Sequence, residues 1–328
     1  MSIERSGPFS RVVATAGYLP SRVVSNDDLA KQLAQSGIAT SDEWIFTRSG
    51  IRQRCLVSGE ENAATMAIEV AKQLLDNAGV SADTLDLILV ATSTPAKAMP
   101  STASMVHQAL GSSAVPAFDL NAACSGYMYA LMVANQWIQS GQAKTAMVIG
   151  SDAMSHLIDW TDRSICVLFG DAAAGFLLRA DADKGLFSVD VSGNGRYTDM
   201  LHARTPCINP SDPSYLMMQG REVYKKAVKV LEKMVNDTLS KHGMSKQAID
   251  WLVPHQANIR IIESTARLLD LPMEQVIVTI DKTANTTAAS VPLAFHHGVQ
   301  DGRIRQGDTV MLEAFGAGFT WGSSLMTY

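Results

Sequence analysis

Cys124 is the residue whose surroundings point most directly to chemistry. It lies in residues 119–126, which read Asp-Leu-Asn-Ala-Ala-Cys-Ser-Gly, between an apolar run typical of a strand (115–120) and a helical pattern (127–139). We therefore expect the thiol at a strand-to-helix turn, where free N–H groups and the positive end of the helix favour the thiolate. A thiolate attacks thioesters. An isolated cysteine, however, is more often a buried and inert core residue.

Two later motifs supply partners for such a nucleophile. Residues 253–258 read Val-Pro-His-Gln-Ala-Asn, and residues 284–290 read Ala-Asn-Thr-Thr-Ala-Ala-Ser. His255 and Asn285 each follow a short apolar run, and strand ends are where an α/β fold presents its chemistry. Taken singly, each residue is commonly a core, surface or turn residue. Together with a cysteine they provide a nucleophile, an imidazole and a neutral amide donor.

These residues, in this order and with these neighbours, resemble β-ketoacyl-acyl-carrier-protein synthase III, a member of the thiolase superfamily. The matching motifs run along the chain from Tyr-Leu-Pro at 18–20 to Phe-Thr-Trp-Gly at 319–322, by way of Thr-Ser-Asp-Glu-Trp at 40–44, Phe-Gly-Asp at 169–171 and His-Gln-Ala-Asn-Ile-Arg at 255–260. The resemblance implies an α/β fold, a thiolase-like five-layered α/β/α/β/α sandwich made of two duplicated halves.

The residues themselves also indicate a duplication. Residues 80–90 (Val-Ser-Ala-Asp-Thr-Leu-Asp-Leu-Ile-Leu-Val) correspond to residues 244–254 (Met-Ser-Lys-Gln-Ala-Ile-Asp-Trp-Leu-Val-Pro), and each follows a helical pattern that ends near a glycine. The same offset aligns residues 145–149 with 309–313. Two matches at one offset favour duplication over chance. We place the N-terminal half, with the cysteine, at residues 1–183, and the C-terminal half, with the histidine and asparagine, at 184–328.

Apolar runs and helical patterns alternate in both halves, which is typical of α/β folds with buried sheets. Strands are expected at 85–91, 117–120, 145–150 and 175–178, and at the corresponding positions 249–253, 275–280, 309–314 and 323–326. Helices are expected at 63–78, 102–110, 126–140, 221–242 and 259–269.

The resemblance also implies a reaction in two stages. Cys124 takes an acyl group from a short acyl-CoA such as acetyl-CoA. Malonyl-acyl carrier protein then loses carbon dioxide and attacks the acyl-enzyme, which initiates fatty-acid synthesis. His255 and Asn285 donate hydrogen bonds to the enolate, whereas the backbone N–H groups of Cys124 and Ala317 stabilise the tetrahedral oxyanion. A neutral amide suits the enolate better than a carboxylate, which would repel it.

Further positions match the family's substrate contacts. Trp44 and Arg163 match residues that sandwich the adenine of CoA, Arg48 matches a phosphate contact, and Asn258 lines the pantetheine tunnel. A tryptophan at position 44 is equally understandable as a packing residue.

A cationic row on the helix at 221–242 marks an expected docking site for the acidic carrier protein. The row consists of Arg221, Lys225, Lys229 and Lys233 at four-residue spacing. Arg260 and Arg267 are expected to extend it. The alternative is an ordinary solvated helix face.

The expected acyl pocket contains Phe315 and, from the partner subunit of a homodimer, Met99. A phenylalanine occupies the position of Met99 in acetyl-selective relatives, and Ala284 and Ala317 stand where glycine is more common. These departures keep open a related condensing enzyme or acyltransferase of a specialised pathway with a different acyl donor. The chain order Cys-His-Asn also occurs in papain-like hydrolases, although the flanking residues differ. A non-catalytic scaffold is disfavoured by the intact site.

Composition sets the remaining expectations. The 328 residues are 47% hydrophobic and 18% charged with a formal net charge of -5, so we expect neither nucleic acid nor membrane as a partner. Four scattered cysteines (Cys55, Cys124, Cys166, Cys207) and the lack of a secretory signal favour the reduced cytoplasm and no metal site. No phosphate-binding or dinucleotide fingerprint is present. Acyl-CoA is therefore expected as a substrate, with no permanently bound cofactor.

Overall fold

Two sheets of the same design form the framework of the molecule. The computed structural model describes residues 8–204 and 215–328. The first sheet has the order β1-β7-β6-β4-β5. Its strands are β1 (Phe9–Tyr18), β7 (Ala172–Asp181), β6 (Thr145–Asp152), β4 (Leu87–Ala91) and β5 (Ala117–Leu120). β1, β7 and β6 pair antiparallel, whereas β6, β4 and β5 pair parallel.

The second sheet repeats this pattern. It consists of β8 (Leu186–Gly193), β13 (Thr320–Thr327), β12 (Thr309–Gly316) and β11 (Trp251–Pro254). β8, β13 and β12 pair antiparallel and β12 and β11 pair parallel, so β8 corresponds to β1, and β11 to β4. The predicted duplication is thereby confirmed. The chain leaves the first sheet at Asp181 and enters the second at Leu186, while the boundary at 183/184 itself stays a prediction.

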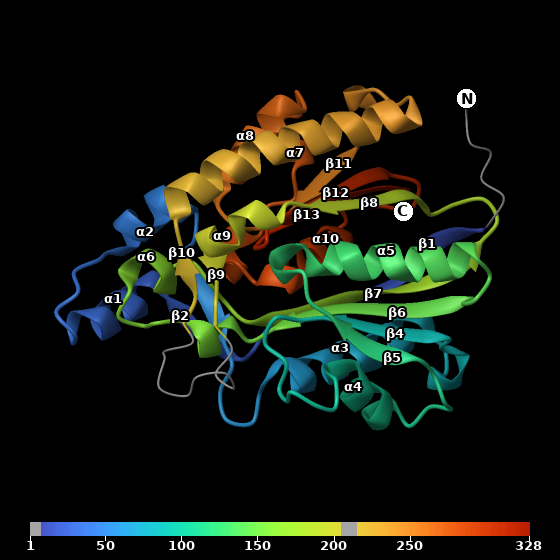
Figure 1. The fold of residues 1–328 in the computed structure, drawn as a ribbon, viewed down its shortest axis with the longest axis horizontal. Coiled ribbons are helices and arrows are strands. Elements are labelled where there is room, and N and C mark those ends of the chain that lie inside the picture. Colours follow the sequence, from blue (N-terminus) through green and yellow to red (C-terminus); the bar gives the residue numbers. More distant parts are fainter. Residues whose placement is uncertain (1–7, 205–214) are drawn as a thin grey trace.

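Helices complete five layers (Figure 1). α5 (Gly126–Gln139) and α10 (Ser290–Gln300) lie between the sheets. α3 (Ala63–Ala78) and α4 (Thr102–Leu110) cover the outer face of the first sheet, and α7 (Gly220–His242) and α8 (Ile259–Leu268) cover the outer face of the second. The predicted five-layered sandwich is confirmed. No helix in the described part of the chain is both long and apolar enough to cross a membrane.

Short elements gather at one end of the sandwich, on the left in Figure 1. They are α1 (Asn26–Ala34), α2 (Asp42–Ser49), α6 (Arg163–Cys166), β2 (Arg22–Ser25), β3 (Gln53–Leu56), β9 (Leu201–His202) and β10 (Met217–Met218). The parallel strands β4 and β11 end towards the same side, which is where an α/β fold places its ligands.

Local sequence accounts for the equivalent helix ends. α3 begins at an Asn62 capping box and ends at Gly79, whose φ of 63° places it in the left-handed region. α7 ends in the same way at Gly243, with φ 61°. Each glycine is followed by a 3-10 turn, η1 (Ala82–Thr84) or η5 (Lys246–Ala248), and then by a parallel strand. The shared sequence at the two positions therefore specifies the same turn twice.

The prediction of a strand at 275–280 was wrong. Only Val276 pairs with β11, through one bridge to Leu252, and the segment ends in the short helix α9 (Ile280–Thr283). The reason is the buried Gln256 side chain. Its Oε1 accepts from the N–H groups of Thr279 (2.9 Å) and Ile280 (3.1 Å), and its Nε2 donates to the carbonyl of Ile277. A side-chain amide thus satisfies backbone groups that a regular strand would pair with a neighbour.

Candidate active site

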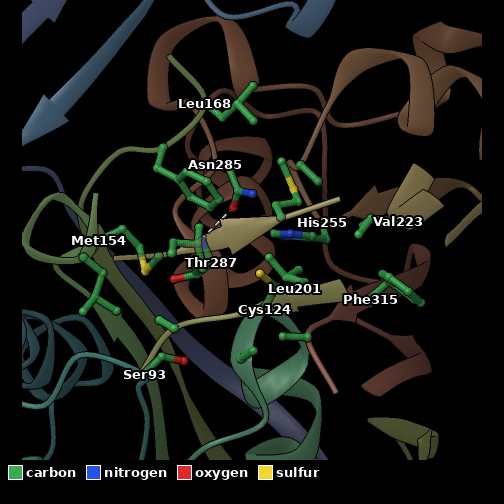
Figure 2. A pocket seen from close by; sticks show the side chains of 18 of the residues that line it. Ser93, Cys124, Met154, Leu168, Leu201, Val223, His255, Asn285, Thr287 and Phe315 are labelled. Atoms are coloured by element: carbon green, nitrogen blue, oxygen red, sulfur yellow. Dashed lines mark hydrogen bonds between the residues drawn. The ribbon is translucent and has the colours of Figure 1, made fainter. Parts of the chain in front are cut away.

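One cavity of about 1320 Å³ brings the predicted catalytic residues together. Cys124, His255 and Asn285 all line it, and Figure 2 shows the three side chains around the same space. They come from three segments far apart in the sequence, and all three are buried. Their placement follows from the duplicated fold, because the helix after β5 and the loop after β11 meet at the same end of the two sheets.

Cys124 lies in the predicted strand-to-helix turn. It belongs to a 3-10 turn, η2 (Ala123–Ser125), that leads directly into α5. The end of β12 presses against this turn: a Cβ built on Gly316 would lie 2.7 Å from the Cys124 nitrogen and 2.9 Å from that of Ser125. Only glycine permits this approach. Sequence reasoning assigned no role to Gly316.

The expectation that the resting protein favours the thiolate was wrong. Burial, and after it the nearby Asp152 carboxylate, raise the pKa of the Cys124 thiol to about 12, against an opposing backbone hydrogen bond at Cys124. The end of α5 does not outweigh this desolvation. At neutral pH, Cys124 is therefore a protonated thiol.

This protonation state predicts a pH profile. Since a thiol with a raised pKa gains thiolate steadily as pH rises, alkylation of Cys124 by iodoacetamide should accelerate about tenfold per unit between pH 7 and 9. Intact-mass spectrometry follows the adduct, with Cys124→Ser as the background control. A rate that levels off near pH 7 would show a thiolate already present in the resting protein.

His255 is held as a neutral ring at the end of β11. Its Nδ1 hydrogen-bonds with the Ser290 hydroxyl, and its backbone N–H donates to the Glu313 carbonyl (2.8 Å). Burial lowers the pKa of the ring to about 4. When the Ser290 hydroxyl donates to Nδ1, the ring proton resides on Nε2, which then acts as a donor. The sequence showed Ser290 in a motif but did not indicate this role.

Asn285 is clamped by the N-terminal half of the chain. Its N–H donates to the Leu168 carbonyl, and its carbonyl accepts from the N–H of Gly170, both at 3.0 Å. The side-chain Oδ1 accepts from the Thr287 N–H (2.9 Å), which leaves the Nδ2 donor as the group available to a ligand. We expected Asn285 to follow a strand, but it follows the helix α9.

Two alanines noted in the sequence differ in backbone conformation. Ala284 has φ 57° and ψ -162°, a combination that glycine adopts far more readily. Ala317 lines the cavity beside Phe315 and is not among the described non-glycine residues with positive φ. An alanine at 317 is thus compatible with its backbone, whereas Ala284 is held in a strained one.

Comparison with known proteins assigns the family. Two family models match, "3-Oxoacyl-[acyl-carrier-protein (ACP)] synthase III" over residues 118–195 and its C-terminal counterpart over residues 239–328. The β-ketoacyl-[acyl-carrier-protein] synthase III of Methylococcus capsulatus is 47% identical over 323 residues, covering 98% of this chain and 99% of the relative. The chain belongs to the β-ketoacyl-[acyl-carrier-protein] synthase III family. It is accordingly an acyltransferase-type condensing enzyme.

Solved structures agree with this assignment. The 3-oxoacyl-[acyl-carrier-protein] synthase III of Aquifex aeolicus superimposes with a TM-score of 0.91 at 41% identity, over 97% of this chain and 100% of that one. The priming β-ketosynthase of the R1128 polyketide biosynthetic pathway also has a TM-score of 0.91, at 32% identity over 98% of this chain and 97% of that one.

Three of the four predicted CoA contacts line the cavity, whereas Arg163 is not among its lining residues. Trp44 and Arg48 of α2 and Asn258 at the start of α8 line it. The Arg48 and Arg163 guanidinium carbons lie 4.4 Å and 4.3 Å from the Trp44 ring centroid. Because Arg163 already stacks on the ring, adenine can enter between them only if Arg163 moves. The Asn258 amide donates to the Arg48 carbonyl (3.0 Å) and so joins α8 to α2.

The predicted docking residues are exposed on two adjoining helices of the synthase. Arg221 and Lys225 lie on α7, and Arg260 and Arg267 lie on α8. The two helices contact each other, and Tyr224 and Ser264 approach to 3.3 Å between them. Lys225 pairs with Glu222 at 2.9 Å, and Arg260 donates to the Thr47 carbonyl at 3.0 Å. Arg260 therefore also has a structural contact.

Met99 does not line the cavity of its own chain. Its side chain is 82% exposed, whereas Lys97 and Ala98 just before it are lining residues. Phe315, the other predicted acyl-pocket residue, lines the cavity and packs on Phe319, with ring centroids 4.8 Å apart. The expected contact of Met99 with the acyl pocket of a partner subunit stays a prediction.

Proposed function

We propose that this synthase condenses a short acyl-CoA with malonyl-acyl carrier protein through an acyl-Cys124 intermediate, and so initiates fatty-acid chains. The observation that carries the proposal is the meeting of Cys124, His255 and Asn285 in one cavity (Figure 2), which Trp44 also lines. Acyl-CoA and the carrier protein are substrates in this reaction, and no resident cofactor is needed. The three free, buried cysteines in the described residues suit the cytoplasm.

In the first stage the Cys124 sulfur attacks the thioester carbonyl. Because the thiol is protonated, its proton must leave as the bond forms, and it passes to the departing CoA sulfur. The N–H groups of Cys124 and Ala317 stabilise the tetrahedral oxyanion. The carbon–sulfur bond to CoA then breaks, and CoA leaves as a thiol carrying the proton.

In the second stage malonyl-acyl carrier protein loses carbon dioxide. The electron pair of the broken carbon–carbon bond becomes a thioester enolate, whose oxygen receives hydrogen bonds from His255 Nε2 and Asn285 Nδ2. Neutral donors held in place in a buried site stabilise such charge without reorganising. The enolate carbon attacks the acyl-cysteine and a carbon–carbon bond forms. The bond between the acyl carbon and the Cys124 sulfur breaks, and the sulfur takes up a proton from water to become a thiol again.

Intact-mass spectrometry tests the proposal. The protein incubated with acetyl-CoA should gain one acyl group, and malonyl-acyl carrier protein should then remove it while a β-ketoacyl carrier protein appears. A hydrolase would instead release free acid continuously without the carrier protein. Absence of any acyl adduct with acetyl-, butyryl- and octanoyl-CoA would contradict the proposed reaction.

A different acyl donor is the second candidate, since the R1128 priming ketosynthase shares the fold. The family resemblance also places Met99 at a position where it implies phenylalanine for acetyl-selective relatives. We propose that Met99 reaches the acyl pocket of a partner subunit in a homodimer. The open edge of β5, with all four residues only partly buried, supports an assembly in which this side of the sheet is covered.

Met99→Phe should restrict the acyl group. A rigid ring at a close-packed position typically costs about 1–3 kcal/mol, and that cost should fall on octanoyl-CoA and spare acetyl-CoA. Acylation rates are compared for acetyl-, butyryl- and octanoyl-CoA, with the exposed Met273→Phe as the matched control. An unchanged ratio across the series, or a monomer in sedimentation, would remove Met99 from the pocket.

Arg267→Glu should raise the KM for malonyl-acyl carrier protein about three- to tenfold and leave acylation by acyl-CoA intact, because a lost surface cation mainly slows encounter with an acidic partner. Arg267 is a cleaner choice than Arg260, whose guanidinium is bonded to Thr47. Arg179→Glu, an exposed change on the first sheet, is the matched control. The difference should shrink as salt is raised. Equal damage to both half-reactions would contradict a docking role.

A further inference from the structure

A buried carboxylate joins the two halves of the chain directly behind the site. Asp152, at the end of β6, is 0% exposed. Its Oδ1 accepts from the Ser93 N–H (2.7 Å) and from the hydroxyls of Thr92 (3.2 Å) and Thr94 (3.1 Å). Its Oδ2 accepts from the Thr287 hydroxyl and the Ala288 N–H (3.2 Å). The donors to Oδ1 thus come from the N-terminal half of the chain, and the donors to Oδ2 come from the C-terminal half.

Thr287 is the link between this carboxylate and Asn285. Its φ is 50°, which is unusual for a β-branched residue and persists only where the surroundings hold it. The Asp152 carboxylate holds the Thr287 side chain, while the Thr287 N–H donates to the Asn285 Oδ1 (2.9 Å). Figure 2 shows Thr287 and Asn285 joined by this bond, with Cys124 close by.

We propose that Asp152 is a positioning residue for the second half-reaction: it holds Thr287 in the conformation that fixes the Asn285 amide, so that Nδ2 points to the enolate. The inference rests on the proposed function, in which Asn285 is an enolate donor. Without the Asp152–Thr287 hydrogen bond, the backbone of Thr287 is free to leave its unfavourable conformation, and the Asn285 amide loses the contact that sets its orientation.

The position requires a carboxylate rather than an amide. Each oxygen of Asp152 faces at least one backbone N–H, that of Ser93 on one side and that of Ala288 on the other. A hydroxyl can rotate to become an acceptor, but an N–H cannot. Asparagine at 152 would therefore set its NH₂ group against an N–H in either orientation of the amide.

The hydrogen bonds to the other carboxylate oxygen, Oδ1, hold residues that line the cavity. Ser93 and Thr94 both line the cavity and begin the segment that leads to Met99. Asp152→Asn should therefore disturb the acyl pocket together with the enolate site. Thr287 donates only to Oδ2, so variants at Thr287 separate an effect on the enolate site from an effect on the acyl pocket.

The experiment compares Thr287→Val, which keeps the shape and removes the hydroxyl, with Thr287→Ser, which keeps the hydroxyl. Acylation of Cys124 by acetyl-CoA is followed by intact mass, and malonyl-acyl carrier protein decarboxylation gives kcat and KM. The valine variant should lose about ten- to a hundredfold in kcat for decarboxylation, less than removal of a donor outright, with KM unchanged and acylation within about twofold. The serine variant should recover most of the lost kcat.

Asn285→Ala, assayed in parallel, separates failure of this inference from failure of the proposed function. If Asn285→Ala loses decarboxylation and Thr287→Val does not, the positioning role is wrong and the function stands. If Asn285→Ala decarboxylates normally, the proposed function itself is wrong. Equal loss of both half-reactions in Thr287→Val, or no recovery in Thr287→Ser, would show a merely structural contact and overturn the inference.

Discussion

Cys124→Ser should abolish formation of the acyl-enzyme and with it the whole condensation. A serine hydroxyl ionises far less readily than a thiol, and the burial that raises the pKa of Cys124 to about 12 would disfavour an alkoxide still more. The expected result is no acyl adduct by intact mass after incubation with acetyl-CoA. It is the largest effect we predict, because every later step needs the acyl-cysteine.

The chain offers matched controls for this change. Cys55 and Cys166 are also free and buried, but neither lines the cavity. Cys55→Ser and Cys166→Ser should therefore acylate at a rate close to that of the native protein. An adduct that persists in Cys124→Ser, and disappears instead in one of these controls, would move the nucleophile to that other cysteine.

Asn285→Ala should separate the two half-reactions. Loss of one aimed donor to an oxyanion typically costs about 10²–10³ in kcat, and we expect malonyl-acyl carrier protein decarboxylation to fall by this amount. Acylation should survive, because Asn285 does not serve the thiol in the proposed first stage. Separate assays of acyl-adduct formation and carbon dioxide release measure the two effects, with the exposed Asn236→Ala as the control.

His255→Ala should lose as much decarboxylation as Asn285→Ala, while acylation of Cys124 should survive at least in part, because the His255 Nε2 proton serves the enolate of the second stage. The two losses should be less than additive in the double variant, since both donors act on one oxygen. Normal decarboxylation in both single variants would contradict the enolate role of this pair.

A correct prediction of the fold depended on features that are local in the chain. The capped helix α3, the glycines at 79 and 243 and the apolar runs of β4 and β11 each specify their own element, and the repeated sequence specifies the same arrangement twice. The bounds of the observed helices and strands differ by a few residues from those expected from the sequence. The exception was 275–280, where a side chain distant in the sequence, that of Gln256, satisfies the backbone. An apolar run does not reveal such a partner.

The identity of the candidate site residues was readable for the same reason. Cys124, His255 and Asn285 stand in short motifs whose order and neighbours resemble a known family, and the cavity contains all three. Their protonation states were not readable. The pKa of Cys124 is decided by how much water the packed structure excludes and by the buried Asp152, neither of which adjoins it in the sequence.

By itself, the sequence determined the layered α/β class, the duplication, the family and the three side chains expected to carry the chemistry, because each is written in nearby residues or in their order. Only the tertiary structure decided what holds those side chains: Ser290 on His255, Gly316 against Cys124, and Asp152 acting through Thr287 on Asn285. These contacts join residues from different strands and helices. Hydrogen bonds and close packing depend on distances across the folded molecule, and the two halves must be packed together before those distances exist.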